Sequence, residues 1–69
     1  MRRYLKIARF EKGMNQREAA KRLNIPIEIY QYFEDGKIMN PLPLWVAVKI
    51  SEVFGLSVDY IESEESKND

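Results

Sequence analysis

The chain has 69 residues, 45% of them hydrophobic, and its 11 basic and 11 acidic side chains balance one another. This length allows one small domain with a single core. The absence of cysteine and histidine excludes disulfides and thiolate metal sites and removes the commonest metal ligand and general base, so the sequence predicts no metal site and no cofactor.

The charges are unevenly distributed along the chain. Residues 1–22 contain eight basic and two acidic side chains, an excess of six positive charges, and the remainder carries an equal negative excess. A basic face can bind phosphates even on a neutral molecule. The alternative interpretation is that these side chains belong to ordinary solvated helix faces.

The first predicted element is a helix over about residues 3–12. Gly13 ends it as a C-terminal cap. Leu5 and Ala8 recur at helical spacing, so one face of this helix is expected to be buried.

A second helix is predicted to begin at Gln16. Asn15 and Glu18 form a capping-box pattern, in which the Asn side chain accepts a backbone N–H and the Glu side chain reaches back. Asn24 is expected to end this helix, because asparagine tolerates the left-handed conformation that a sharp reversal needs.

A third helix follows after a tight turn, from about Pro26 to Glu34. Proline suits the first turn of a helix, and Asp35-Gly36 is typical of a turn. Tyr30 and Phe33 are expected to face the core. Two short helices joined in this way form a helix-turn-helix pattern.

Two further helices are predicted in the second half of the chain. One runs from Pro43 or Leu44 to Phe54, and Ser57 caps a last short helix that ends near residue 61. The acidic stretch from residue 62 lacks apolar side chains and is predicted to be disordered, so the domain is expected to span residues 1–61 and the tail residues 62–69. The inward stripe of the fourth helix is expected to consist of Leu44, Ala47, Ile50, Ser51 and Phe54.

Five short motifs follow one another along the chain: Arg9, Asn15-Gln16, Glu34-Asp35-Gly36, Asn40-Pro41 and Gly-Leu-Ser-Val-Asp-Tyr-Ile at 55–61. In this order and at this spacing, the sequence resembles the Cro/repressor helix-turn-helix family, also called XRE-like, the DNA-binding domain of phage repressors and many small bacterial regulators. The family usually has Glu-Asn-Gly where this chain has Glu34-Asp35-Gly36. The resemblance covers about residues 3–61 and implies an all-α, compact, five-helix, lambda-repressor-like domain with the helix-turn-helix at its second and third helices.

The resemblance implies a set of contacts to the DNA backbone. In the family, the Arg at the position of Arg9 pairs with the Glu at the position of Glu34 near the phosphates, and Gln16 grips a phosphate at a helix start. A structural alternative exists for two of them: the Arg9–Glu34 pair only braces the fold, and Asn15 is a plain N-cap. The predicted phosphate-binding residues are Arg9, Asn15, Gln16, Arg17, Lys37 and Asn40.

The resemblance also places the base-reading positions on the exposed face of the third helix. Here the sequence departs from the family, which often has amide, hydroxyl or basic side chains there. Such an apolar and acidic face also fits a protein-binding surface on a fold with weak or lost DNA binding. The predicted base-reading residues are Pro26, Ile27, Glu28, Gln31 and Tyr32.

A dimer contact is expected along the C-terminal helices, as in the family, because Trp45 and Val48 lie off the inward stripe of the fourth helix. The alternative is that Trp45 folds back over Tyr4 and Ile7. The predicted interface consists of Trp45, Val48, Leu56, Tyr60 and Ile61.

We therefore expect a transcriptional regulator, in the simplest case a repressor, that binds double-stranded DNA as a homodimer in the cytoplasm and is encoded by a bacterium or a phage. The alternative is a protein-interaction module of the same fold, antitoxin-like or an anti-repressor partner. The sequence has no nucleophile–base pair, no glycine-rich phosphate loop and no apolar run of membrane-spanning length, so neither an enzyme nor a membrane protein is expected.

Overall fold

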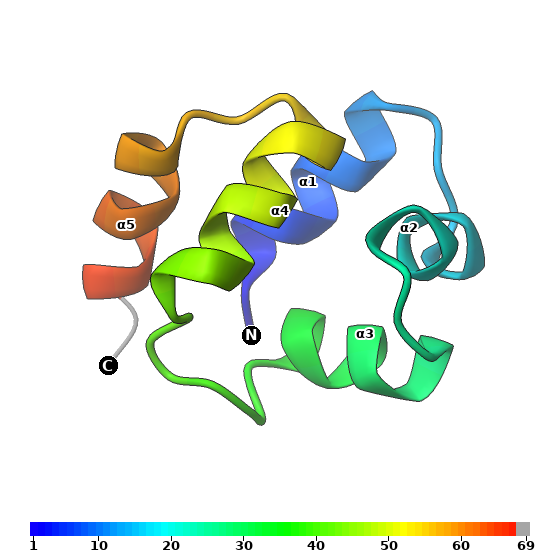
Figure 1. Ribbon diagram of the computed structural model, residues 1–69, viewed down its shortest axis with the longest axis horizontal. Coiled ribbons are helices and arrows are strands. Elements are labelled where there is room, and N and C mark those ends of the chain that lie inside the picture. The colour runs from blue at the N-terminus through cyan, green and yellow to red at the C-terminus, as the bar shows by residue number, and fades with distance from the viewer. Residues whose placement is uncertain (68–69) are drawn as a thin grey trace.

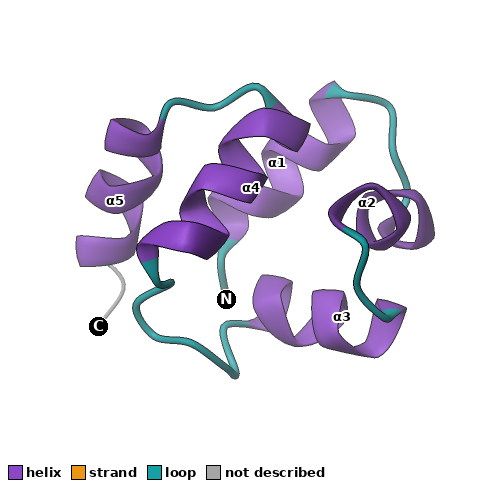
Figure 2. Cartoon of the chain, in the orientation of Figure 1, coloured by secondary structure: helices purple, strands orange, loops and turns teal. Residues whose placement is uncertain are grey.

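The computed structural model describes residues 1–67, which form five α-helices and no β-strand (Figure 2). In Figure 1, α1 and α4 occupy the centre of the view, α2 and α3 lie to the right and below, and α5 lies at the left. The predicted all-helical class is confirmed. None of these helices is both long and apolar enough to cross a membrane. The helices are α1 (Arg3–Glu11), α2 (Gln16–Leu23), α3 (Ile27–Asp35), α4 (Leu44–Phe54) and α5 (Val58–Ser66).

The ends of α2 and α3 follow from local side-chain chemistry. Asn15 Oδ1 accepts a hydrogen bond from Glu18 N at 2.8 Å, and Glu18 Oε1 accepts one from Asn15 N at 2.9 Å, so both bonds of the predicted capping box are present. Asn24 ends α2 with φ at 60°, in the left-handed region. α3 begins one residue later than predicted, because Pro26 is its N-cap and has an extended backbone.

Each of the five helices contributes one side chain with no exposed surface to a single core. These side chains are Leu5, Ala19, Tyr30, Ile50 and Ile61. The small side chain of Ala19 allows another helix to approach α2 closely. Tyr30 and Phe33 are both buried as predicted, so α3 has one side in the core and one side in solvent.

The inward stripe of α4 differs from the prediction at Leu44, and the predicted Ser51 is only half-buried. Leu44 is 62% exposed, whereas Val46 is 4% exposed. Leu44 directly follows the N-cap Pro43, and the core begins about half a turn further along the helix. The buried row is therefore Val46, Ala47, Ile50 and Phe54.

The prediction that the tail is disordered is wrong for residues 62–66. α5 continues from Val58 to Ser66, with Lys67 as its C-cap, and Glu65 is only 6% exposed. Glu65 lies one helical turn after the buried Ile61, so it faces inwards, where Arg2 pairs with it. Residues 62–67 thus belong to the same body as the domain, and the part of the prediction that concerns residues 68–69 lies outside the described residues.

Candidate functional site

Glu34 lies at the centre of a buried cluster that joins α1, α2 and α3. Arg9 Nε donates a hydrogen bond to Glu34 Oε2 at 2.6 Å, and Tyr30 OH donates to the same oxygen at 2.5 Å. Gln16 Nε2 donates to Glu34 Oε1 at 3.2 Å, and Arg9 Nη1 donates to the Met14 carbonyl oxygen at 3.0 Å. The predicted Arg9–Glu34 pair is confirmed. We call Arg9, Gln16, Tyr30 and Glu34 the Glu34 cluster.

The two charged side chains of the Glu34 cluster, Arg9 and Glu34, stabilise each other's ionised form although they are buried. Burial alone would raise the pKa of Glu34, but the hydrogen bonds from Arg9, Tyr30 and Gln16 outweigh it and hold that pKa below its ordinary value. The hydrogen bond to Glu34 raises the pKa of Arg9. Arg9 is only 5% exposed. Its guanidinium therefore braces α1 against α3, which is the structural alternative, and offers little surface to a phosphate.

Three of the other predicted phosphate-binding side chains also have partners within the protein. Gln16 accepts a hydrogen bond from Gln31 Nε2 at 3.2 Å in addition to its bond to Glu34, so α2 and α3 are tied at this point. Asn15 is the N-cap of α2. Asn40 Oδ1 accepts from Arg2 at 2.9 Å, and Asn40 Nδ2 donates to the Gly36 carbonyl oxygen at 2.7 Å.

Arg17 and Lys37 are the predicted phosphate-binding residues with freely exposed basic side chains. Arg17 lies in the first turn of α2, and Lys37 lies just after α3. They come from different elements that flank α3 in the sequence. Both are available to a polyanion.

The predicted base-reading residues lie on the outer side of α3 or at its border. Pro26, Glu28 and Tyr32 are exposed, whereas Ile27 and Gln31 are half-buried. The nine residues of α3 include no basic side chain but two exposed acidic ones, Glu28 and Asp35. The outer side of α3 therefore combines apolar and polar side chains and carries a net negative charge.

A second buried cluster was missed by the sequence analysis, which assigned Arg2 to a basic face and Glu65 to a solvated tail. Arg2 Nε donates to Glu65 Oε2 at 2.7 Å, and Tyr4 OH donates to the same oxygen at 2.6 Å. Arg2 is 1% exposed. The spacing of four between Ile61 and Glu65 was the available signal, because it puts both on one face of a continued helix. We call Arg2, Tyr4 and Glu65 the Glu65 cluster.

The predicted dimer residues divide into two groups. Trp45, Val48 and Tyr60 are 63%, 40% and 45% exposed, and Leu56 is half-buried. Ile61 has no exposed surface, so its assignment to the interface is wrong, because it lies on the core-facing side of α5.

The alternative position for Trp45, folded over Tyr4 and Ile7, is also not what the structure shows. Trp45 borders a small pocket that Ile25 and Phe33 also line. Tyr60 is the aromatic side chain that covers Tyr4, with ring centroids 6.2 Å apart in an edge-on arrangement. The outer side of α4 is therefore left as an apolar surface around Leu44, Trp45 and Val48.

Comparisons with known proteins add no family assignment: no family model, curated protein or solved structure matches this chain.

Proposed function

We propose that this chain is a DNA-binding transcriptional regulator, in the simplest case a repressor, with a lambda-repressor-like fold. In this proposal α2 and α3 form the helix-turn-helix, and α3 enters the major groove. The observation that carries the proposal is that α3 is buried on one side and exposed on the other. Tyr30 and Phe33 fix its inner side in the core, whereas Pro26, Glu28 and Tyr32 stay exposed along its outer side. A helix presented in this way fits the major groove.

The position of Gln31 supports base reading. Gln31 uses one N–H group of its side chain to bond Gln16, and a glutamine amide has a second N–H and a carbonyl oxygen. A donor and an acceptor side by side match the edge of adenine. The bond to Gln16 would restrict the rotamer of Gln31 before DNA arrives.

The surroundings of α3 support contact with the DNA backbone. The N-terminus of α2 is the positive end of that helix, and Arg17 is exposed in its first turn. Lys37 is exposed just after the C-terminal end of α3. Phosphate contacts of this kind would fix the position of α3 without reading sequence.

A homodimer is part of the proposal, because two copies related by a two-fold axis would read an inverted repeat with half-sites one helical turn apart, about 34 Å. Trp45 and Val48 remain the candidates for the contact, with the exposed Leu44 beside them. Such a regulator would act in the cytoplasm of a bacterium on a chromosomal or phage operator.

The test is selection from a random double-stranded DNA library, followed by titration of the best duplex and of its scramble at several salt concentrations. We expect a two-fold symmetric motif, a clear preference over the scramble, and affinity that falls steeply with salt. Lys37→Ala should weaken binding to all sequences alike, whereas Gln31→Ala should relax the preference at one base pair in each half-site. No enrichment, with equally weak binding to both duplexes, would contradict the proposal.

A second candidate function, recognition of another protein, is favoured by the acidic outer side of α3. Glu28 and Asp35 repel phosphates, and Tyr32 at 43% exposure is a common kind of protein-interface anchor. The variants separate the two functions in cells. Loss of regulation in Tyr32→Ala, with full regulation in Arg17→Ala and Lys37→Ala, would favour the protein partner.

A further inference from the structure

The loop between α3 and α4, residues 36–43, is tied to both ends of the described chain. Arg2 donates from its guanidinium to three acceptors in this loop, and Glu65 accepts from the backbone N–H of Leu42 at 2.9 Å. Since Glu65 also binds Arg2, one carboxylate holds the loop directly and through the arginine. The three acceptors of Arg2 are the carbonyl oxygens of Ile38 (3.2 Å) and Met39 and the side-chain oxygen of Asn40 (2.9 Å).

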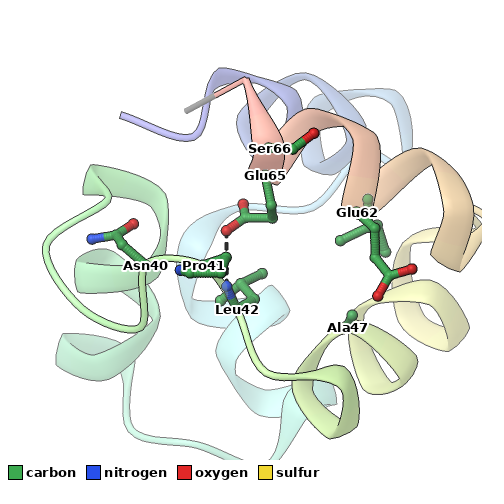
Figure 3. A pocket seen from close by; sticks show the side chains of 8 residues that line it. Asn40, Pro41, Leu42, Ala47, Glu62, Glu65 and Ser66 are labelled. Carbon is green, nitrogen blue, oxygen red and sulfur yellow. Dashed lines mark hydrogen bonds between the residues drawn. The ribbon is translucent and has the colours of Figure 1, made fainter. Parts of the chain in front are cut away.

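The bond from Glu65 to the loop lies at the edge of an open hollow. A hollow of about 510 Å³ lies between Pro41 and Leu42 of the loop and Ala47 and Ile61 of the helices. In Figure 3, Glu65 reaches from α5 to the backbone nitrogen of Leu42 beside this hollow. Glu65 and Leu42 both line this hollow, so the hydrogen bond between them joins α5 to the loop at its edge.

The loop conformation itself depends on such support. Met39 has a φ of 55°, in the left-handed region that a residue with a long side chain rarely adopts. The carbonyl oxygen of Met39 accepts a hydrogen bond from Arg2. A strained residue of this kind persists only where its surroundings hold it, and the guanidinium of Arg2, fixed by Glu65, is such a support.

We propose that Glu65 is a positioning residue for DNA binding: through Arg2 and Leu42 it holds the α3–α4 loop in the shape that presents Lys37 to a phosphate. Lys37 and Asn40 are exposed on this loop. Glu65 itself makes no contact with DNA. This inference rests on the proposed function and assigns to the end of α5 a part in the affinity of that site.

The first test follows the loop without DNA. Glu65→Gln removes the charge that neutralises Arg2 and replaces an accepting oxygen by a donor. We expect faster amide hydrogen exchange at residues 37–40 and at Leu42, by a larger factor than any change in the centre of α2. Glu64→Gln is the matched control, because the neighbouring Glu64 pairs with Lys67 at the surface. Equal exchange in Glu65→Gln and Glu64→Gln would overturn the proposal.

The second test measures DNA affinity against salt for the wild type, Glu65→Gln, Lys37→Ala and the double variant. We expect Glu65→Gln to weaken binding to specific and scrambled duplexes alike and to lower the salt slope by about 1, the effect of one lost phosphate contact. In the double variant, the loss should equal that of Lys37→Ala alone. A residue that only stabilises the fold would instead add its effect to that of Lys37→Ala, and that result would overturn the proposal.

A milder variant covers the case in which Glu65→Gln does not fold. Arg2→Lys keeps a positive charge for Glu65 but lacks the guanidinium fork that reaches several acceptors at once, so it should reproduce the faster loop exchange and the lower salt slope. Wild-type protein that binds no DNA would overturn the function and this inference together. Tight, salt-dependent wild-type binding that Arg2→Lys and Glu65→Gln leave unchanged would overturn this inference alone.

Discussion

At the scale of single residues, two buried carboxylates are satisfied in the same way. Each accepts a hydrogen bond from an arginine Nε and from a tyrosine hydroxyl on one of its oxygens. No buried side-chain nitrogen or oxygen in the described part of the chain lacks a hydrogen-bond partner. Because a buried arginine left without its carboxylate costs far more than the intact pair contributes, both clusters make the fold sensitive to single substitutions. The two sets are Arg9, Tyr30, Glu34 and Arg2, Tyr4, Glu65.

Replacement of Glu34 tests the first cluster. Glu34→Gln leaves the charge of Arg9 buried without a counter-charge, so we expect the free energy of unfolding to fall by about 3–5 kcal/mol, the usual cost of breaking a buried pair. Urea denaturation followed by far-ultraviolet circular dichroism gives the value. Glu28→Gln, at an exposed position of the same helix, should change stability by no more than about 0.5 kcal/mol.

The same cluster predicts a dependence of stability on pH. The pKa of Glu34 is lowered in the folded protein, so the unfolded chain takes up a proton first as the pH falls. The stabilisation is therefore complete above the unfolded pKa of about 4.3 and is lost as the pH falls through the folded pKa. Glu34→Gln should flatten this part of the stability curve, and an equally steep acid limb in the variant would contradict the assignment.

At the scale of helices, local chemistry predicted where α2, α3 and α4 begin and end within one residue. The helix caps act on backbone groups only a few residues away, so the local sequence is enough to predict them. These caps are Asn15 with Glu18, Asn24 and Gly55. The end of α5 was not predictable in this way. Glu65 is buried because of Arg2, which is 63 positions away in the sequence. Composition alone gives no sign of such a partner.

Truncation after Ile61 tests whether the end of α5 belongs to the fold. Loss of Glu65 leaves the buried Arg2 unpaired, at a cost of about 3–5 kcal/mol. A domain of this length has a total stability on the order of 3–10 kcal/mol, so the truncated chain should lose most of its structure in mild urea, as measured by far-ultraviolet circular dichroism.

A compensating substitution separates lost pairing from lost helix length. Arg2→Met in the truncated chain removes the unpaired charge and should recover part of the stability. A truncated chain that is as stable as the full one would instead favour the disordered tail that composition predicts.

At the scale of the whole molecule, burial changes the charge distribution that the sequence predicts. Arg2 and Arg9 are neutralised inside the protein by carboxylates from the acidic part of the chain, residues 23–69, so the excess positive charge of residues 1–22 is smaller at the surface. The resemblance predicted the Arg9–Glu34 pair. It did not predict that the side-chain amides of Gln16 and Asn40 donate hydrogen bonds within the protein. Those bonds depend on tertiary contacts, which spacing along the chain does not encode.

The apolar outer side of α4 is the feature of the whole molecule that bears on assembly. Leu44 and Trp45 are each more than 60% exposed, and Val48 lies one turn along the same helix. Exposed large apolar side chains that gather on one helix are typical of interaction surfaces. A two-fold contact here would bury the same side chains from both copies.

Trp45→Glu tests this contact. Because a charge placed at the centre of an isologous interface meets its own copy, we expect the variant to be monomeric in sedimentation equilibrium at concentrations where the wild type dimerises. Its affinity for a full inverted repeat should fall to that for a half-site. Ile7→Glu, at a 50% exposed position of α1, is the matched control and should leave the dimer intact. Dimerisation that survives Trp45→Glu but not Ile7→Glu would move the interface from α4 to α1 and would require a different spacing of the two α3 helices on DNA.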